Sequence, residues 1–197
     1  QGAHVTAVVR SPAKVPAFRS DRLKIAIGNP CDTGFLTPLL RGQDALISTL
    51  GGRRPTRKAT DVYPLSAASI VDAAWNSGLK RVVVTSTALL FPPATWRDRL
   101  VAALVPNVVQ SANRMERILC AADLDVTVAR CGWLNDGAET EYRASPAALP
   151  EGGTSISRKG LARFLVDAAL AGGSGPKIFG VAGPNRLGRV PEGARTA

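Results

Sequence analysis

The chain has 197 residues, of which 45% are hydrophobic and 20% charged, so it can form the core of one ordinary globular domain. No apolar run reaches the ~18 residues of a membrane-spanning helix, and the N-terminal residues show no signal-peptide pattern. The formal net charge of +10 favours anionic partners such as phosphorylated cofactors, acidic substrates or nucleic acid, although arginines spread over a solvated surface are the simpler explanation.

The few cysteines and histidines argue against several kinds of site. Cys31, Cys120 and Cys131 are widely spaced and match neither a disulfide framework nor a metal-binding spacing. We therefore expect reduced thiols in a cytoplasmic protein. His4 is the only histidine, which argues against a histidine metal site and against a Ser-His-Asp triad.

The first half of the chain alternates apolar strands with helices. Strands are expected over 4–9, 23–28 and 44–52, and helices over 33–42 and 62–79. Glycine ends both predicted helices, as is common at helix C-termini.

The second half continues the alternation. Strands are expected over 80–90, 125–134 and 177–183, and helices over 108–124 and 158–173. The strands lack a clear alternation of apolar and polar residues, which is typical of a parallel sheet covered on both faces.

Right-handed crossovers between such strands predict an α/β fold with a doubly wound, Rossmann-like parallel sheet. We expect residues 1–183 to form this one domain. The last residues, 184–197, are rich in proline, glycine and arginine and are expected to be a flexible tail.

Five segments occur in an order that characterises a known family. They are VTAVVRSPAK (5–14), STLGG (48–52), SIVDAAWNSGLKRVVVTST (69–87), LDVTVARCGWLNDG (124–137) and SISRKGLARFLVDAAL (155–170). Together they resemble the NAD(P)H-binding atypical short-chain dehydrogenases, most closely the flavin reductase or biliverdin reductase type, with NmrA-like proteins as relatives. The resemblance covers about residues 3–183.

The resemblance implies a first strand, a G-x-x-G-x-x-G turn and a helix ahead of the strand at 4–9, so the domain is expected to be N-terminally truncated. The missing strand would lie between 4–9 and 44–50, and its absence predicts an unstable chain that binds NADPH poorly. The glycine-rich stretch 171–180 runs from helix to strand, the wrong direction for a phosphate-binding turn. A circular permutant using 177–188 is a less favoured alternative.

Three positions near the adenosine end of the cofactor follow from the resemblance. Arg10 and Ser11 end the strand whose tip meets the adenosine ribose, and an arginine there favours the 2′-phosphate of NADP over NAD. Asn29 stands where the family usually has an aspartate near the adenine, and it can still accept a hydrogen bond. An exposed strand-end arginine and a simple turn are the alternatives.

The exit of the third predicted strand is a further cofactor contact implied by the family. Leu50, Gly51 and Gly52 would let the cofactor backbone approach closely, although an ordinary strand-exit turn is the alternative. The basic run RRPTRK at 53–58 could line the mouth of the site, but a solvated basic loop is the favoured interpretation.

The end of the fourth predicted strand carries the one candidate for catalysis. Ser86 and Thr87 lie where short-chain dehydrogenases keep a catalytic serine, and both are expected to contact the cofactor. The chain departs from that family because no Tyr-x-x-x-Lys follows, and Asn113 and Arg114 occupy the region where a lysine would be expected. An alcohol dehydrogenase mechanism is therefore disfavoured.

The end of the fifth predicted strand would run beside the nicotinamide. The residues expected to bind the cofactor there are Arg130, Cys131, Gly132 and Trp133. The family more often has Arg-Pro where this chain has Arg130-Cys131. Trp133 could stack on a ring, and a core or rim position is an equal alternative.

These expectations predict an NADPH-binding oxidoreductase-like protein that transfers hydride to a flavin-like or other conjugated acceptor, with NAD a less favoured cofactor. The protein would mainly orient two flat rings. The alternatives are an NmrA-like sensor that binds cofactor without chemistry, and an inactive fragment. Nucleic-acid binding is the weakest alternative, since no basic motif interleaved with aromatics occurs. No membrane partner and no metal are expected.

Overall fold

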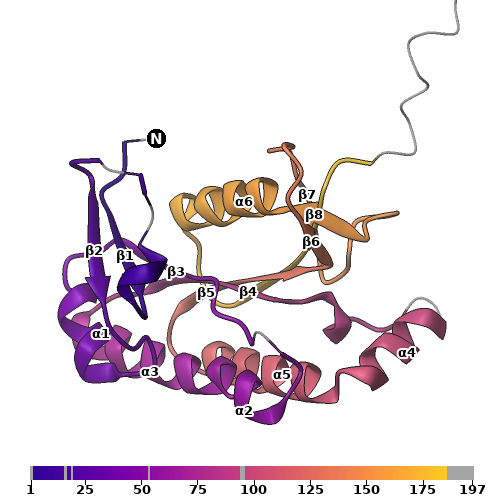
Figure 1. Ribbon diagram of the computed structural model, residues 1–197, viewed down its shortest axis with the longest axis horizontal. Helices are drawn as coiled ribbons and strands as arrows, with labels where there is room; N and C mark the ends of the chain where they lie inside the picture. The colour runs from indigo at the N-terminus through magenta and orange to yellow at the C-terminus, as the bar shows by residue number, and fades with distance from the viewer. Residues whose placement is uncertain (1, 16, 19, 53, 94–95, 186–197) are drawn as a thin grey trace, which may run out of the picture.

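The structure is a computed structural model of the chain, and it describes residues 2–15, 17–18, 20–52, 54–93 and 96–185. Figure 1 shows a sheet with α6 on one side and α1, α3 and α5 on the other. This layering is the arrangement that the alternating strands and helices predict. No helix among the described residues is long and apolar enough to cross a membrane.

The central sheet has five strands in the order β3-β4-β5-β9-β7. These strands span Ala45–Ser48 (β3), Arg81–Thr87 (β4), Asp125–Cys131 (β5), Lys177–Ala182 (β9) and Arg143–Pro146 (β7). The first four are parallel, which confirms the predicted Rossmann-like architecture. The fifth, β7, is antiparallel to β9 and departs from the expectation of a wholly parallel sheet.

Two small parallel sheets stand apart from the central one. One pairs β1 (Val5–Val9) with β2 (Leu23–Ile27), and the other pairs β6 (Trp133–Asn135) with β8 (Ser155–Ser157). Within the described part of the chain, no ladder joins β1 to β3. The two strands expected to flank a missing strand therefore do not pair with each other.

The helices cover both faces of the sheet and connect its strands. They are η1 (Pro12–Lys14), α1 (Thr33–Leu40), α2 (Arg57–Thr60), α3 (Val62–Ser77), η2 (Ala88–Leu90), α4 (Trp96–Leu104), α5 (Pro106–Cys120) and α6 (Arg158–Ala171). Asp32 caps α1 by accepting a hydrogen bond from the Phe35 backbone N–H. Gly78 ends α3 with φ +78°, a left-handed conformation that favours glycine.

Strand β4 explains why the predicted strands read as continuous apolar runs. Val82 and Val84 belong to the core cluster packed against α1, α3 and α5. Val83 belongs to a second cluster, which packs against α6. Successive side chains of a strand point to opposite faces, so a strand buried on both faces needs apolar residues throughout.

Several predicted bounds differ from the structure. The strand expected over 80–90 ends at Thr87 and continues as η2, and the one expected over 125–134 breaks at Gly132. The chain passes there into the β6-β8 pair, and a Cβ at Gly132 would collide with the carbonyl oxygen of Thr154. Helix α4 and the strands β7 and β8 were not predicted.

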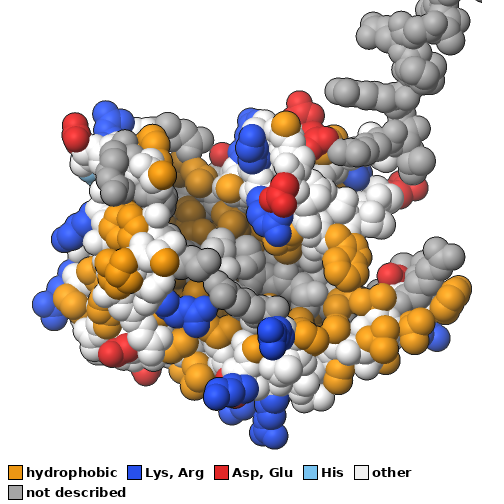
Figure 2. Space-filling model, in the orientation of Figure 1, with side chains coloured by type: hydrophobic (Ala, Val, Ile, Leu, Met, Phe, Trp, Pro, Cys, Tyr) orange, Lys and Arg blue, Asp and Glu red, His pale blue; other side chains and the backbone are white. Residues whose placement is uncertain are grey.

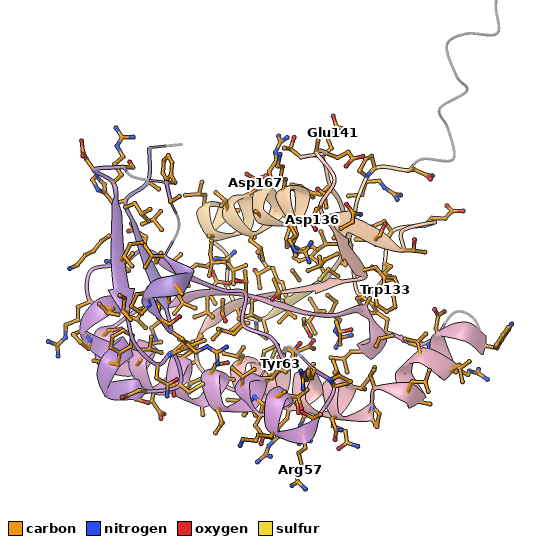
Figure 3. The ribbon with its side chains drawn as sticks, in the orientation of Figure 1. Arg57, Tyr63, Trp133, Asp136, Glu141 and Asp167 are labelled. Carbon is orange, nitrogen blue, oxygen red and sulfur yellow. The ribbon has the colours of Figure 1, made fainter. Side chains whose placement is uncertain are left out.

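Parts of two predictions fall outside the structural description. Residues 186–197 of the expected tail and Arg53 of the basic run are not among the described residues. The rest of that run is exposed, and Arg57 and Lys58 begin α2 rather than extending a loop. Figure 3 shows Arg57 pointing away from the molecule, which agrees with a solvated basic segment.

Candidate functional site

A pocket of about 490 Å³ opens at the carboxyl ends of β3, β4 and β5. Besides the strand ends, Tyr63 of α3, Val108 of α5 and several residues of α6 line it. In open α/β sheets, ligands bind in the crevice outside the carboxyl ends of the strands. Figure 2 shows this face of the molecule hollowed, with hydrophobic side chains inside the hollow and Lys and Arg side chains around it.

A second cavity, of about 140 Å³, lies against β8 and includes Arg143. Arg143 donates hydrogen bonds to the backbone carbonyls of Gly183 and Glu151, at 3.0 and 2.9 Å. Its guanidinium thus links the segments that contain Gly183 and Glu151. The larger pocket is the better candidate for a ligand site because it holds the strand ends.

The pocket brings together half of the residues expected at the site. Those that line it are Leu50, Gly51, Ser86, Thr87, Cys131 and Gly132. Those that do not are Arg10, Ser11, Asn29, Gly52, Arg130 and Trp133. Contacts to neighbouring protein groups explain several of these placements.

Ser86 belongs to a buried polar network. Its hydroxyl donates to the carboxylate of Glu116, with 2.5 Å between Oγ and Oε1. Arg130 binds both oxygens of the same carboxylate, at 2.6 Å from Nη2 to Oε2 and 3.1 Å from Nε to Oε1. Glu116 is only 4% exposed, so its charge needs these partners.

The Arg130 side chain contacts several protein groups besides Glu116. Its Nη1 donates to the Leu90 carbonyl at 3.1 Å, and its guanidinium lies 4.7 Å from the centre of the Phe91 ring. The charge expected to face the cofactor therefore neutralises Glu116 instead. The sequence did not predict a role for Glu116, because the ion-pair partner of an acid on a helix depends on how that helix packs against the sheet.

Cys131 lies at the end of β5 with its thiol buried. The thiol donates a weak hydrogen bond to the Ser86 carbonyl, with 3.4 Å between Sγ and O. Burial raises the pKa of the Cys131 thiol to about 11. It is therefore protonated at neutral pH and is not an activated nucleophile.

The residues expected near the adenosine lie at the ends of β1 and β2. Arg10 is exposed just after β1. Its charge lowers the pKa of the nearby Cys31 thiol, although burial, the larger effect, raises that pKa overall. The Asn29 Oδ1 accepts a hydrogen bond from the Cys31 backbone N–H at 3.1 Å, which stabilises the turn into α1. Asn29 thus has a local structural role.

Gly51 and Gly52 approach other protein groups closely. A Cβ at Gly52 would lie 2.8 Å from the Ala59 carbonyl oxygen, and one at Gly51 would lie 3.2 Å from the Tyr63 hydroxyl. A side chain at Gly52 would therefore collide with the α2 backbone, whereas one at Gly51 would only crowd the Tyr63 hydroxyl. Tyr63 itself was not predicted as a site residue, because helical periodicity does not show where a tyrosine hydroxyl lies.

Trp133 does not line the pocket. It is 71% exposed, and Figure 3 shows it apart from Tyr63. Its backbone N–H donates to the Thr154 carbonyl at 3.0 Å. The tryptophan expected beside the nicotinamide is therefore a surface residue in this structure.

The lining of the larger pocket combines apolar side chains with hydroxyl groups. Leu161 and Leu165 of α6 supply apolar surface, and the threonines at the end of β4 supply hydroxyl groups. An apolar pocket with a few convergent polar groups is typical of a cofactor site.

The parallel sheet and the pocket at its carboxyl edge define a Rossmann-like nucleotide-binding domain. The profile of a protein family described as NAD(P)H-binding matches residues 1–171. The chain belongs to this NAD(P)H-binding family.

Solved structures share this fold. A short-chain dehydrogenase/reductase from Veillonella parvula in complex with NADP has a TM-score of 0.76 and 21% identity, over 92% of this chain and 83% of that chain. An oxidoreductase from Lactococcus lactis has a TM-score of 0.75 and 17% identity, over 94% and 82%. A Rossmann-fold NAD(P)-binding family protein from Shigella flexneri has a TM-score of 0.66 and 21% identity, over 94% and 83%.

Proposed function

We propose that the chain is an NADPH-dependent reductase that acts on a flavin-like or another conjugated acceptor. The observation that carries the proposal is the pocket at the ends of β3, β4 and β5, where one apolar wall faces several hydroxyl groups. When bound, the nicotinamide supplies hydride. The work left to the protein is to hold two flat rings in contact and to keep water away from them.

The described residues divide this work between them. Leu161, Ala162 and Leu165 of α6 give the pocket an apolar wall on which a flat ring can pack. Thr85 and Thr87 offer hydroxyl groups on the opposite side, at the end of β4. The net charge of +10 draws anionic cofactors and acceptors toward the protein.

The proposal is tested by following NADPH oxidation at millimolar NADPH with flavin mononucleotide (FMN) as the acceptor. We expect FMN-dependent oxidation that saturates with FMN. NADPH binding without turnover on FMN or other conjugated acceptors would instead support an NmrA-like sensor. The absence of both NADPH binding and turnover would contradict the proposal.

We also retain a cytoplasmic location and small-molecule partners in this proposal. All three cysteines are free in the structure, as expected in a reducing compartment. The exposed basic residues do not form a motif interleaved with aromatics, so nucleic acid stays the weaker candidate for an anionic partner.

Arg10→Ala is expected to remove the preference for a 2′-phosphate. A charge-assisted hydrogen bond is worth about 1.5–3 kcal/mol, which corresponds to roughly a 10- to 150-fold loss in affinity. The measurement is an NMR titration of parent and variant with 2′,5′-ADP and with 5′-AMP. The parent should prefer 2′,5′-ADP and the variant should bind both alike. An equal preference in both proteins would show that Arg10 does not contact the phosphate.

Ser86→Ala is expected to leave FMN reduction within about tenfold of the parent, roughly 1.4 kcal/mol in the barrier. The Ser86 hydroxyl donates a hydrogen bond to Glu116, so it is already engaged within the protein. The measurement is kcat for both proteins at saturating FMN. A thousandfold loss, with an unchanged melting temperature, would instead identify Ser86 as a catalytic residue.

A further inference from the structure

The pocket holds several groups that could donate a proton. They are the hydroxyls of Thr49, Tyr63, Thr85, Ser86 and Thr87 and the thiol of Cys131. Two of them already donate within the protein, since Ser86 donates to Glu116 and Cys131 donates to the Ser86 carbonyl. The remaining candidates are three threonine alcohols and one phenol.

Tyr63 differs from the threonines in acid strength. A phenol has a pKa of about 10, whereas an aliphatic alcohol does not ionise in the range in which proteins are studied. A proton donor acts best when its pKa lies near the working pH. Among the uncommitted donors that the structure places in the pocket, the phenol is thus the one suited to proton transfer.

The position of Tyr63 directs its hydroxyl to the pocket. Its side chain packs against the core cluster beneath the sheet, and Figure 3 shows it on the α3 side of the sheet, away from Asp136 and Asp167. The hydroxyl lies beside Gly51 at the exit of β3. Packing of the ring fixes the direction of the phenol, so the hydroxyl needs little reorganisation to meet a ligand.

The Gly52 backbone stabilises the ionised form of this phenol. Burial, the larger effect, raises the pKa of Tyr63, and a hydrogen bond with the Gly52 backbone lowers it. A bond of this kind lowers a phenol pKa when the amide N–H donates to the oxygen.

We propose that Tyr63 is the proton donor of this pocket and protonates the acceptor as it is reduced. The inference rests on the proposed function. A hydride, which is one proton with two electrons, leaves the reduced nicotinamide as its C–H bond breaks and forms a new bond to the acceptor. The displaced electron pair of the conjugated system moves to an acceptor heteroatom. The Tyr63 hydroxyl transfers its proton to that atom, and the phenolate left behind regains a proton from water.

The first test measures the pKa of Tyr63 in the absence of turnover. The chain has only two tyrosines, so Tyr142→Phe leaves Tyr63 as the single tyrosine signal. In that variant, ¹³Cζ-labelled tyrosine is titrated by NMR with and without saturating FMN. A phenol that donates to a ligand is held in its neutral form, so FMN is expected to raise the pKa of Tyr63. An unchanged titration curve with bound FMN would overturn the contact.

The second test separates binding from chemistry. Tyr63→Phe keeps the ring that packs on the core and removes only the hydroxyl. We expect kcat for FMN reduction to fall by about 10²–10⁴, the usual contribution of a general acid, while KM changes by less than about tenfold. The parent should lose kcat at high pH as Tyr63 ionises, and the variant should lack this pH dependence.

Tyr142→Phe is the matched control. The Tyr142 hydroxyl donates to Asp167 at 2.9 Å and does not line the pocket, so its removal should leave kcat unchanged. An active parent with an equally active Tyr63→Phe variant would overturn the role of Tyr63 alone. An inactive parent would contradict the proposed function, and proton transfer with it. The two failures are therefore distinguishable.

Discussion

Replacing Glu116 with alanine is expected to lower the free energy of unfolding by about 3–5 kcal/mol, the usual effect of removing one partner of a buried ion pair. The carboxylate accepts hydrogen bonds from both Ser86 and Arg130. Its loss leaves the Arg130 charge largely buried between Leu90, Phe91 and β5 without an anion. Water reaches this guanidinium poorly, so its desolvation is no longer compensated.

The measurement is urea unfolding of parent and variant, with a matched exposed pair as the control. Lys80 and Asp123 form an ion pair at 3.1 Å on the surface, so Asp123→Ala should change the unfolding free energy by less than about 1 kcal/mol. Glu116→Gln, which keeps the size of the side chain and loses its charge, should fall between the two. Equal losses for Glu116→Ala and Asp123→Ala would show that the buried network does not stabilise the fold.

NADPH is expected to bind the 197-residue chain with a dissociation constant far above the micromolar range. The sequence contains no G-x-x-G-x-x-G turn, the feature that presents backbone N–H groups and a helix N-terminus to a pyrophosphate. Charged hydrogen bonds are worth about 1.5–3 kcal/mol each. Lacking two or three of them removes most of the ~8 kcal/mol that a micromolar affinity represents.

Isothermal titration of the purified chain with NADPH up to millimolar concentrations measures this affinity. The Arg10→Ala variant serves as a control, because it should weaken binding further only if the adenosine end is engaged. Micromolar binding by the parent would contradict the prediction. It would also favour another phosphate contact, such as the stretch 177–188 that a circular permutant would use.

The central layers of the fold were predictable because burial on two faces requires recognisable apolar patterns in the sequence. A strand such as Val82–Val84 must be apolar on both sides, and a helix such as α3 must present an apolar face. The strands β6 and β8 have three residues each, too few to show a period. Helix α4 was missed although Trp96, Leu100 and Leu104 follow helical spacing, and in the structure these three side chains are exposed.

The candidate site was predictable only as far as strand ends determine it. Topology alone brings Gly51, Ser86 and Cys131 to one edge of the sheet, because parallel strands end together. Glu116 and Tyr63 reach that edge from helices, and their contacts depend on how the helices pack. Arg130 was expected at the cofactor for the same reason, since nothing in the sequence pairs it with Glu116.

Strands β1 and β2 form a sheet of their own, so we expect this part of the chain to open at a free energy different from that of the central sheet. No ladder joins β1 to β3 within the described residues, and the pair is connected to the rest of the domain through helix packing such as that of Leu36 and Leu40 on the core. Proteins unfold locally in such cooperative units, each with its own free energy of opening. We therefore expect that mutations in β1 or β2 can change the stability of this small sheet without changing the pocket at the ends of β3, β4 and β5.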